Sequence, residues 1–165
     1  MARYFASGEQ TLIADLAAAD TALTVTSNAS TPNRGWVYEV NFGNYGSPAD
    51  LTSLYLVGRV TAVGTATART PTKLDPADRA AQSVASENHT GEPTYQNTQT
   101  GLDDFREGDL LRVALNHRGT MRWAAPPDGE LIFPATANNG VGIKASHASA
   151  TTEYFGSFHW RECRD

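Results

Sequence analysis

The chain has 165 residues, 40% of them hydrophobic and 19% charged, with a formal net charge of −5. This length fits one domain with a real core, and the acidic balance argues against a nucleic-acid partner, which needs a basic patch. The sequence contains no run of about 18 apolar residues, so no membrane span is predicted. Because the first residues, MARYFASGEQ, lack the apolar core of a signal peptide, we expect the protein to be made and kept in a cytoplasm.

The first predicted elements are a short strand over residues 3–7 and a helical turn within 11–23, where alanine and leucine are frequent. A second strand is expected to begin near Leu23. Apolar and threonine side chains alternate over 23–26, which is the period-two pattern of a half-buried strand.

The clearest alternation lies at 35–43, GWVYEVNFG. One face of this predicted strand, which we expect to point into the core, holds Trp36, Tyr38, Val40 and Phe42. The following strand, at 53–63, is apolar on both faces over most of its length, so we expect it to lie in the centre of a sheet.

The segment 64–101 is predicted to be a long loop insertion, because threonine, alanine, proline and glycine are frequent in it. Within it, one short helix is expected over about 76–86, since Asp75 suits an N-cap and Pro76 suits the first helical position. Long loops in compact β-domains often carry function, so we expect this one to contact a neighbouring subunit. The candidate contact residues are Thr70, Pro71, Lys73, Asp75, His89 and Tyr95.

The carboxy-terminal part of the chain predicts five further strands separated by tight turns. Their expected ranges are 109–116, 119–125, 130–135, 141–146 and 152–162. Turns are indicated at 126–129, Pro-Pro-Asp-Gly, and at Asn139-Gly140, a pair that favours the type I′ hairpin turn. The tryptophans, all expected on inward faces, are Trp36, Trp123 and Trp160.

Eight or nine short strands with frequent turn residues predict an all-β fold, either a sandwich or a barrel. We expect a single-domain antiparallel β-sandwich over residues 1–165, with its strands arranged as a jelly roll. The long loop at about 64–101, with its one short helix, is the expected insertion into this sandwich.

The chain shows no residue pattern that predicts an enzyme, a cofactor or a metal site. The glycines of NNGVGIK, at 138–144, fit neither a phosphate loop nor a dinucleotide loop. Asp75 and its neighbouring aspartates do not follow a calcium-loop pattern, and no known motif pairs a nucleophile with a base. The histidines lack a helical metal spacing and are expected at the surface or in an interface: His89, His117, His147 and His159.

The single cysteine, Cys163, lies two residues from the last residue. One cysteine cannot form a disulfide within the chain. Two interpretations stay open: an inert thiol on a tail, or a disulfide between two subunits.

Several longer segments are distinctive when they are taken together. They read YLVGRVTAVGTATARTPTKLDPAD after SPAD, then ENHTGEPTY, then RWAAPPDGELIFPATANNGVGI, and finally TEYFGSFHWRE. Over roughly residues 35–162, the chain resembles a family of small β-sandwich structural proteins of tailed bacteriophages. The shared features are turn and strand patterns, so the resemblance implies a fold and a broad class and no catalytic residue.

Within that class, the resemblance implies a capsid decoration, or cement, protein. Such a protein is a non-enzymatic part of the virion, often a jelly roll, that sits as a homotrimer on the outer shell. Its partners would be further copies of itself and the major capsid protein, and its place the capsid surface of particles assembled in a bacterial cytoplasm. Two alternatives stay open: a tail, fibre or adaptor component, and a carbohydrate-binding module, which needs exposed coplanar aromatic side chains.

Overall fold

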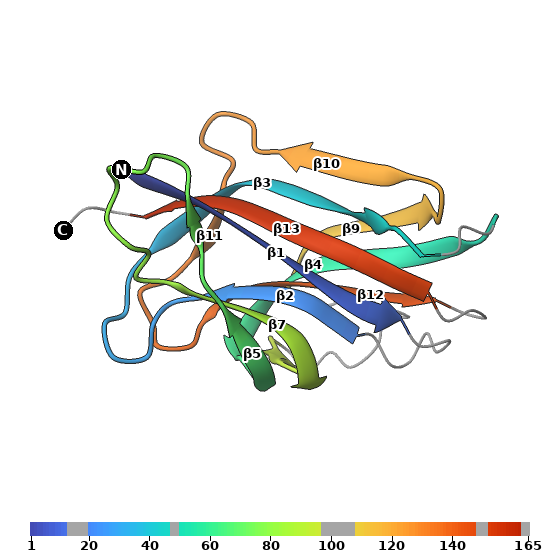
Figure 1. Cartoon of the computed structure of the whole chain (residues 1–165), viewed down its shortest axis with the longest axis horizontal. Coiled ribbons are helices and arrows are strands. Elements are labelled where there is room, and N and C mark those ends of the chain that lie inside the picture. Colours follow the sequence, from blue (N-terminus) through green and yellow to red (C-terminus); the bar gives the residue numbers. More distant parts are fainter. Residues whose placement is uncertain (13–19, 47–49, 97–107, 148–151, 163–165) are drawn as a thin grey trace.

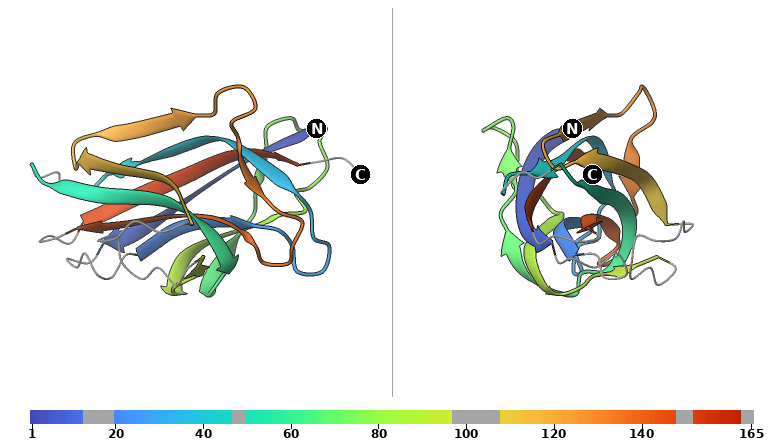
Figure 2. Two further views of the ribbon diagram at one scale, coloured as in Figure 1. Left: turned by 180° about the vertical axis from the view of Figure 1, so that it is seen from behind. Right: turned by 90° about the vertical axis from the view of Figure 1, so that its right-hand side faces the viewer.

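The computed structural model describes residues 1–12, 20–46, 50–96, 108–147 and 152–162, and every helix or strand assigned within these ranges is a β-strand. The strands form two antiparallel sheets that pack face to face, as the side and end views show (Figures 1 and 2). The prediction of an all-β antiparallel sandwich is therefore confirmed. The helical turn expected within 11–23 falls mostly on 13–19, which lie outside the described residues.

One sheet, called sheet A, contains six strands. They are β1 (Ala2–Leu12), β3 (Gly35–Asn44), β6 (Thr72–Lys73), β10 (Thr120–Ala124), β11 (Leu131–Phe133) and β13 (Thr152–Glu162). Their order is β10-β3-β13-β1-β6, and β11 also pairs with β3. The long strands β1 and β13 pair along their whole length, from Ala2 opposite Glu162 to Leu12 opposite Thr152. Sheet A is thus organised around this central pair.

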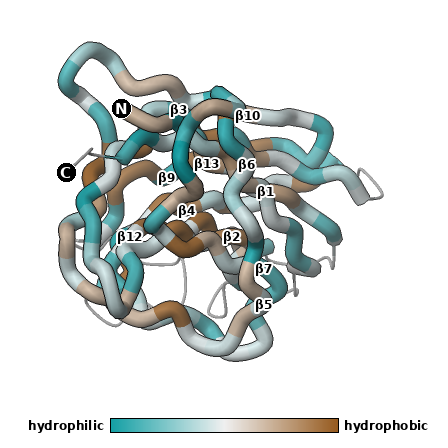
Figure 3. Tube along the Cα trace, turned by 60° about the vertical axis from the view of Figure 1, so that its left-hand side comes forward, coloured by the Kyte–Doolittle hydropathy of each residue, from teal (hydrophilic) through white to brown (hydrophobic). Residues whose placement is uncertain are grey.

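The other sheet, called sheet B, contains seven strands. They are β2 (Asp20–Thr26), β4 (Thr52–Ala62), β5 (Thr65–Arg69), β7 (Val84–Gly91), β8 (Thr94–Tyr95), β9 (Asp109–Asn116) and β12 (Gly140–His147). Their order is β5-β7-β2-β12-β4-β8, and β9 also pairs with β4. In the hydropathy view, hydrophobic segments gather where β2, β4 and β12 run through the interior (Figure 3).

Eight of the strands pair in a nested order along the chain. The strand β1 pairs with β13, β2 with β12, β3 with β10, and β4 with β9. These pairs alternate between the two sheets, so that successive elements of the chain cross the sandwich. The remaining strands are additions: β5 to β8 lie between β4 and β9 in the sequence, and β11 lies between β10 and β12.

Aromatic side chains from both sheets fill the core. The rings of Phe42 in sheet A and Tyr55 in sheet B stack at 4.9 Å, and Tyr154 meets Tyr55 edge-on at 5.9 Å. Each fully buried ring of this kind contributes roughly 1.5–3 kcal/mol through burial of apolar surface. A glycine, Gly156, faces Ile143 across the core, where a Cβ atom would stand only 2.7 Å from the isoleucine Cδ1. The sheets therefore approach closely at this point.

A β-bulge in β3 changes which side chains face the core. Opposite β13, the register passes from His159 paired with Glu39 to Trp160 paired with Val37, which leaves Tyr38 as the extra residue. Val37, Val40 and Phe42 are fully buried, whereas Trp36 and Tyr38 are half-buried and lie on the outer face of sheet A. The prediction that Trp36 and Tyr38 point inward is wrong, because the bulge reverses the alternation at this position.

The segment 64–101 is not one long loop. Its described part, which ends at residue 96, contains β5, β6, β7 and β8. The chain crosses from sheet B, where β5 pairs with β7, to sheet A, where β6 pairs with β1. Threonine-rich sequences such as TATAR have strand propensity, and here they pair with existing sheet edges.

The short helix expected over 76–86 is also absent, and β7 begins at Val84. Asp75 does start a turn: its carboxylate accepts from the Ala77 N–H at 2.9 Å, and its carbonyl accepts from the Asp78 N–H at 3.0 Å. No helix follows this turn: Lys73 Nζ donates to the carbonyls of Pro76 and Asp78 at 2.7 and 2.9 Å, and the N–H groups of Gln82 and Ser83 donate to the Glu162 carboxylate. Tertiary contacts thus replace the helical hydrogen bonds.

Candidate functional site

The six predicted contact residues fall into two groups. Thr70, Pro71, Lys73 and Asp75 follow one another along the crossover from β5 to β6 and the turn after it, at or near the surface. His89 and Tyr95 are only 6% and 3% exposed, so their prediction as surface contacts is wrong. Lys73 and Asp75 hold the turn through the hydrogen bonds described above, which gives both a structural role.

Tyr95 covers the outer face of sheet B. Its hydroxyl lies 3.0 Å from Thr21 Oγ1, and its ring stacks over two glycines, Gly58 and Gly142, that leave room for it. The ammonium of Lys144 lies 4.5 Å from the centre of the same ring. Burial lowers the pKa of Lys144 to about 8 and raises the pKa of Tyr95. This cluster packs the sheet and presents no open surface.

Two histidines meet at one end of sheet B. The rings of His117 and His147 lie 4.6 Å apart, edge to face, and His117 Nε2 is 2.7 Å from Ser53 Oγ. All three residues are buried, so their prediction as surface histidines is wrong for His117 and His147. Burial lowers the pKa of both imidazoles, which favours the neutral forms. The hydroxyl of Ser53 has no exposed surface for a substrate, and we assign this group to packing.

The edge of β1 that faces away from β13 lies in two different environments along its length. At Tyr4 and Phe5, β6 covers this edge, and the Leu74 N–H extends the contact by donating to the Arg3 carbonyl at 3.0 Å. Beyond Phe5, no strand within the described residues pairs with this side of β1. The residues just before β6, which could have extended it along β1, instead lie in sheet B as β5.

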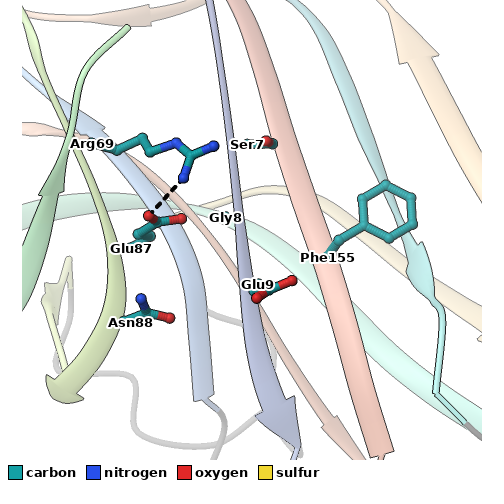
Figure 4. Close-up of a pocket in the computed structure, with 7 residues that line it drawn as sticks. All are labelled: Ser7, Gly8, Glu9, Arg69, Glu87, Asn88 and Phe155. Carbon is teal, nitrogen blue, oxygen red and sulfur yellow. Dashed lines mark hydrogen bonds and ion pairs between the residues drawn. The ribbon is translucent and has the colours of Figure 1, made fainter.

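A cleft of about 440 Å³ occupies this position (Figure 4). Four strands supply its lining residues: Ser7, Gly8, Glu9, Arg69, Glu87, Asn88 and Phe155. Arg69 and Glu87 form an ion pair at 3.0 Å on one side, and Phe155 lies on the far side of β1 from them, as Figure 4 shows. The volume falls in the lower part of the range of about 300–1,000 Å³ that is typical of binding sites.

Two backbone features shape this cleft. Gly8 lies where β1 approaches β2 so closely that a Cβ atom would collide with the Ala22 carbonyl oxygen. Asn88 has a φ of 51°, a left-handed conformation that few residues other than glycine adopt easily. It follows Glu87 where the pairing of β7 with β5 becomes irregular, and this irregularity brings its side chain to the cleft.

The outer face of sheet A carries a second surface, called the aromatic face. It consists of half-buried rings from three neighbouring strands: Phe5, Trp36, Tyr38, Phe155 and His159. The ring of His159 meets Phe5 at 4.8 Å and Tyr38 at 6.0 Å, both edge to face. These contacts join Phe5, Tyr38 and His159, one ring from each of β1, β3 and β13, into a cluster.

Charged side chains border the aromatic face. Arg161 pairs with Glu130 at 2.7 Å and lies over the Trp36 ring at 5.7 Å. With Arg3 and Tyr38, these two charged residues line a small hollow of about 210 Å³. On the other border, a hydrogen bond of 2.6 Å from Arg122 lowers the pKa of Glu39 to about 2.

No protein-family model and no curated protein matches this chain. Its candidate sites are therefore argued from the geometry of its own residues. Within the described residues, no group of three or more histidine, cysteine, aspartate or glutamate side chains is placed to hold a metal ion. No helix of the described chain is long and apolar enough to cross a membrane. The predicted disulfide residue, Cys163, lies outside the described residues.

Most of the cleft residues carry no recognisable signal in the sequence. Arg69 and Phe155 are distant in the chain from Ser7 and Glu9. They meet because β1 pairs with β13 and contacts β7, which pairs with β5. Asn88 is the one partial exception, because asparagine is enriched at left-handed positions. The predicted contact residues Thr70 and Pro71 follow Arg69 in the chain, but neither lines the cleft.

Proposed function

We propose that this protein is a non-enzymatic structural component of a bacteriophage virion, a capsid decoration protein that binds the outer shell. It stabilises contacts between adjacent major capsid subunits, and it acts as a homotrimer. The single observation that carries the proposal is the aromatic face, and the resemblance described above supplies the class of partner.

The nested strand pairs support the architecture expected of such a protein. When eight strands pair first with last, second with seventh, third with sixth and fourth with fifth, the chain forms one long antiparallel ribbon. Rolling that ribbon gives two sheets of four strands, with the orders β10-β3-β13-β1 and β9-β4-β12-β2 found in this chain. We interpret this arrangement as a jelly roll with β5–β8 and β11 added.

The aromatic face has the composition of a protein interface. Aromatic and arginine side chains dominate the hot spots of such interfaces, and charged residues gather at the rim. The patch matches this pattern, with Trp36, Tyr38 and Phe5 flanked by Arg161 and Arg3. Half-buried rings also lose little conformational entropy on binding, because only two side-chain torsions must be fixed.

The stabilising effect would follow from mass action. A protein that binds the assembled shell better than it binds free subunits shifts the equilibrium toward the shell. A trimer placed on a lattice engages several sites at once, so that a weak contact at each site gives strong attachment overall.

Co-sedimentation of purified protein with shells of its parent phage tests the proposal. We expect the wild-type protein to sediment with shells and the Trp36→Ala variant to bind at least about tenfold more weakly, as for a hot-spot residue. Leu74→Ala serves as the control, because Leu74 is an exposed apolar residue outside the aromatic face. A native mass measurement tests the trimer. Wild-type protein that stays monomeric and never binds shells would refute the proposal.

The alternatives differ in place and ligand. A tail, fibre or adaptor component would appear at the tail in electron micrographs of labelled particles, and a decoration protein over the whole shell. A carbohydrate-binding module gains some support because Trp36 and Tyr38 lie on an outer face. However, Arg161 lies over the Trp36 ring, which competes with a sugar for that surface. Binding to a glycan array that depends on Trp36 would favour the carbohydrate alternative.

A further inference from the structure

The uncovered part of the β1 edge carries hydrogen-bonding groups of the main chain. In an antiparallel strand, alternate residues direct both their N–H and their C=O to the same side. The Arg3 carbonyl accepts from Leu74 on the β6 side, so the groups of Ser7 and Glu9 face this side as well. Within the described residues, neither pairs with a strand there. The Thr11 N–H on the same edge is satisfied by the Gln10 side chain at 3.1 Å.

The reason for the uncovered edge lies in the crossover. β6 runs antiparallel to β1 and begins at Thr72, opposite Phe5. The preceding residue is Pro71, which has no N–H to donate, and the chain before it lies in sheet B as β5. Within the described residues, no strand therefore pairs with β1 along Ser7 and Glu9, and the cleft of about 440 Å³ opens beside them.

We propose that an extended peptide segment of a partner protein binds in this cleft and pairs with β1 as an added strand. Strand addition takes its affinity from main-chain hydrogen bonds and its specificity from the pockets that receive alternate side chains. Ser7 and Glu9 supply the main-chain groups. One set of side chains of the added strand meets Glu87 and Asn88, and the other set lies on the outer face beside Ser7 and Glu9.

The charges of the cleft indicate the chemistry of the partner segment. Two carboxylates, Glu9 and Glu87, line the cleft against one cation, Arg69, which already pairs with Glu87. A lysine or arginine opposite Glu9 forms a favourable cross-strand pair. A second copy of this chain, whose net charge is −5, is a poorer match than a basic segment of another protein. The identity of the partner rests on the proposed function, under which the segment belongs to the major capsid protein.

Proline substitution on the edge tests the main-chain contact. Glu9→Pro removes an N–H that faces the cleft and leaves the ladder to β13 intact, since proline is tolerated on strand edges. Glu9→Ala removes only the side chain, and Thr11→Pro removes an edge N–H outside the cleft lining. We expect Glu9→Pro to weaken binding to shells at least about tenfold relative to Glu9→Ala, and Thr11→Pro to leave it near the wild-type value. Urea unfolding of each variant verifies that the fold is kept.

A second experiment is independent of the phage assignment. A synthetic peptide of alternating threonine and valine with one central lysine is titrated into the isotope-labelled protein, and amide shifts are followed by nuclear magnetic resonance. The expected result is a shift of the Ser7 and Glu9 amides, with binding about fivefold weaker when glutamate replaces the lysine.

The outcomes separate the two proposals. If wild-type protein binds shells and Glu9→Pro binds them as well as Glu9→Ala does, strand addition is wrong and the decoration role stands. If wild-type protein does not bind shells, the decoration role is wrong, and the peptide titration alone decides on strand addition. A titration in which Ser7 and Glu9 do not respond overturns it, as does a response that is equal for both peptides.

Discussion

The two halves of the β1 edge belong to one strand and one sheet, yet one half is covered by another strand and the other half is open. At Tyr4 and Phe5 the edge is covered by β6 and by the turn that follows it. At Ser7 and Glu9 it borders an open cleft. The strand itself alternates buried and more exposed residues through both halves, so the difference comes from the partners and not from β1.

The covered half is held by a buried polar network. The Glu162 carboxylate, with no exposed surface, accepts hydrogen bonds from the N–H groups of Gln82 and Ser83, each at 3.0 Å, and from the Ser83 hydroxyl. Trp160 Nε1 donates to Ser83 Oγ at 2.9 Å, and the Tyr4 hydroxyl donates to the Arg79 carbonyl at 3.1 Å. Covering an edge thus requires specific buried partners for every polar group, and the open half lacks such a network.

The largest effect is expected from removing the centre of this network. Glu162→Ala leaves the N–H groups of Gln82 and Ser83 buried without their acceptor, which should lower the free energy of unfolding by about 3 kcal/mol. Urea denaturation measures the change. The control is Glu153→Ala, which removes an exposed carboxylate from the same strand and should cost less than about 0.5 kcal/mol.

Amide exchange then shows whether the loss is local. We expect Glu162→Ala to speed exchange at Leu74, whose N–H is bonded to Arg3, more than at positions in β12. Equal acceleration everywhere would mean that the network stabilises the whole sandwich and not the covered edge, and the contrast between the two halves would lose its basis.

A smaller effect is expected at the cleft, where Asn88 adopts a left-handed backbone conformation with φ at 51°. Asn88→Ala should destabilise the protein by about 1 kcal/mol, because alanine pays the steric cost of that conformation. Asn88→Gly removes the same side chain without that cost and should be neutral or slightly stabilising. Thermal unfolding of the pair measures the difference, and two variants of equal stability would show that the backbone at Asn88 is not strained.

The sequence predicted the regular part of this fold well. Alternation located β3 and β13. The type I′ hairpin turn predicted at Asn139-Gly140 is wrong, because the positive φ is at Asn138 and β11 and β12 lie in different sheets. Prediction from the sequence failed where a local irregularity or a distant partner decides the outcome. Trp36 and Tyr38 were predicted on the wrong face. Val37 and Tyr38 are both apolar, so the sequence pattern does not show that Tyr38 is the extra residue of a bulge.

The segment 64–101 shows the second kind of failure. Asp75 and Pro76 have the local signature of a helix start, and a single turn does form there. The chain after it is instead held by Glu162, whose carboxylate accepts from Gln82 and Ser83 about 80 residues away in the chain. For the same reason no local pattern reveals the cleft, since Glu9, Arg69 and Phe155 meet only in the folded sheets.

The smallest effect is a dependence on pH that should distinguish the two halves. His89 belongs to β7 on the open side, where its carbonyl accepts from the Gln10 side chain at 3.0 Å, and burial lowers the pKa of its imidazole. An unfolded histidine has a pKa near 6.5, so the unfolded chain binds the proton first as the pH falls. Its contribution to stability is therefore present above about pH 6.5 and is lost below it, until the lower folded pKa is reached.

The other three histidines also have lowered pKa values through burial, so the stability of the whole protein should fall below about pH 6.5. Local opening free energies from amide exchange separate the contribution of His89. Acid should favour opening of β7 more than opening at Leu74, because the network around Glu162 contains no histidine. The His89→Gln variant, which cannot take up the proton, should abolish this difference. If β7 and Leu74 respond equally to acid in the wild-type protein, the open side is no more sensitive than the covered side, and the cause must be sought at His117 and His147.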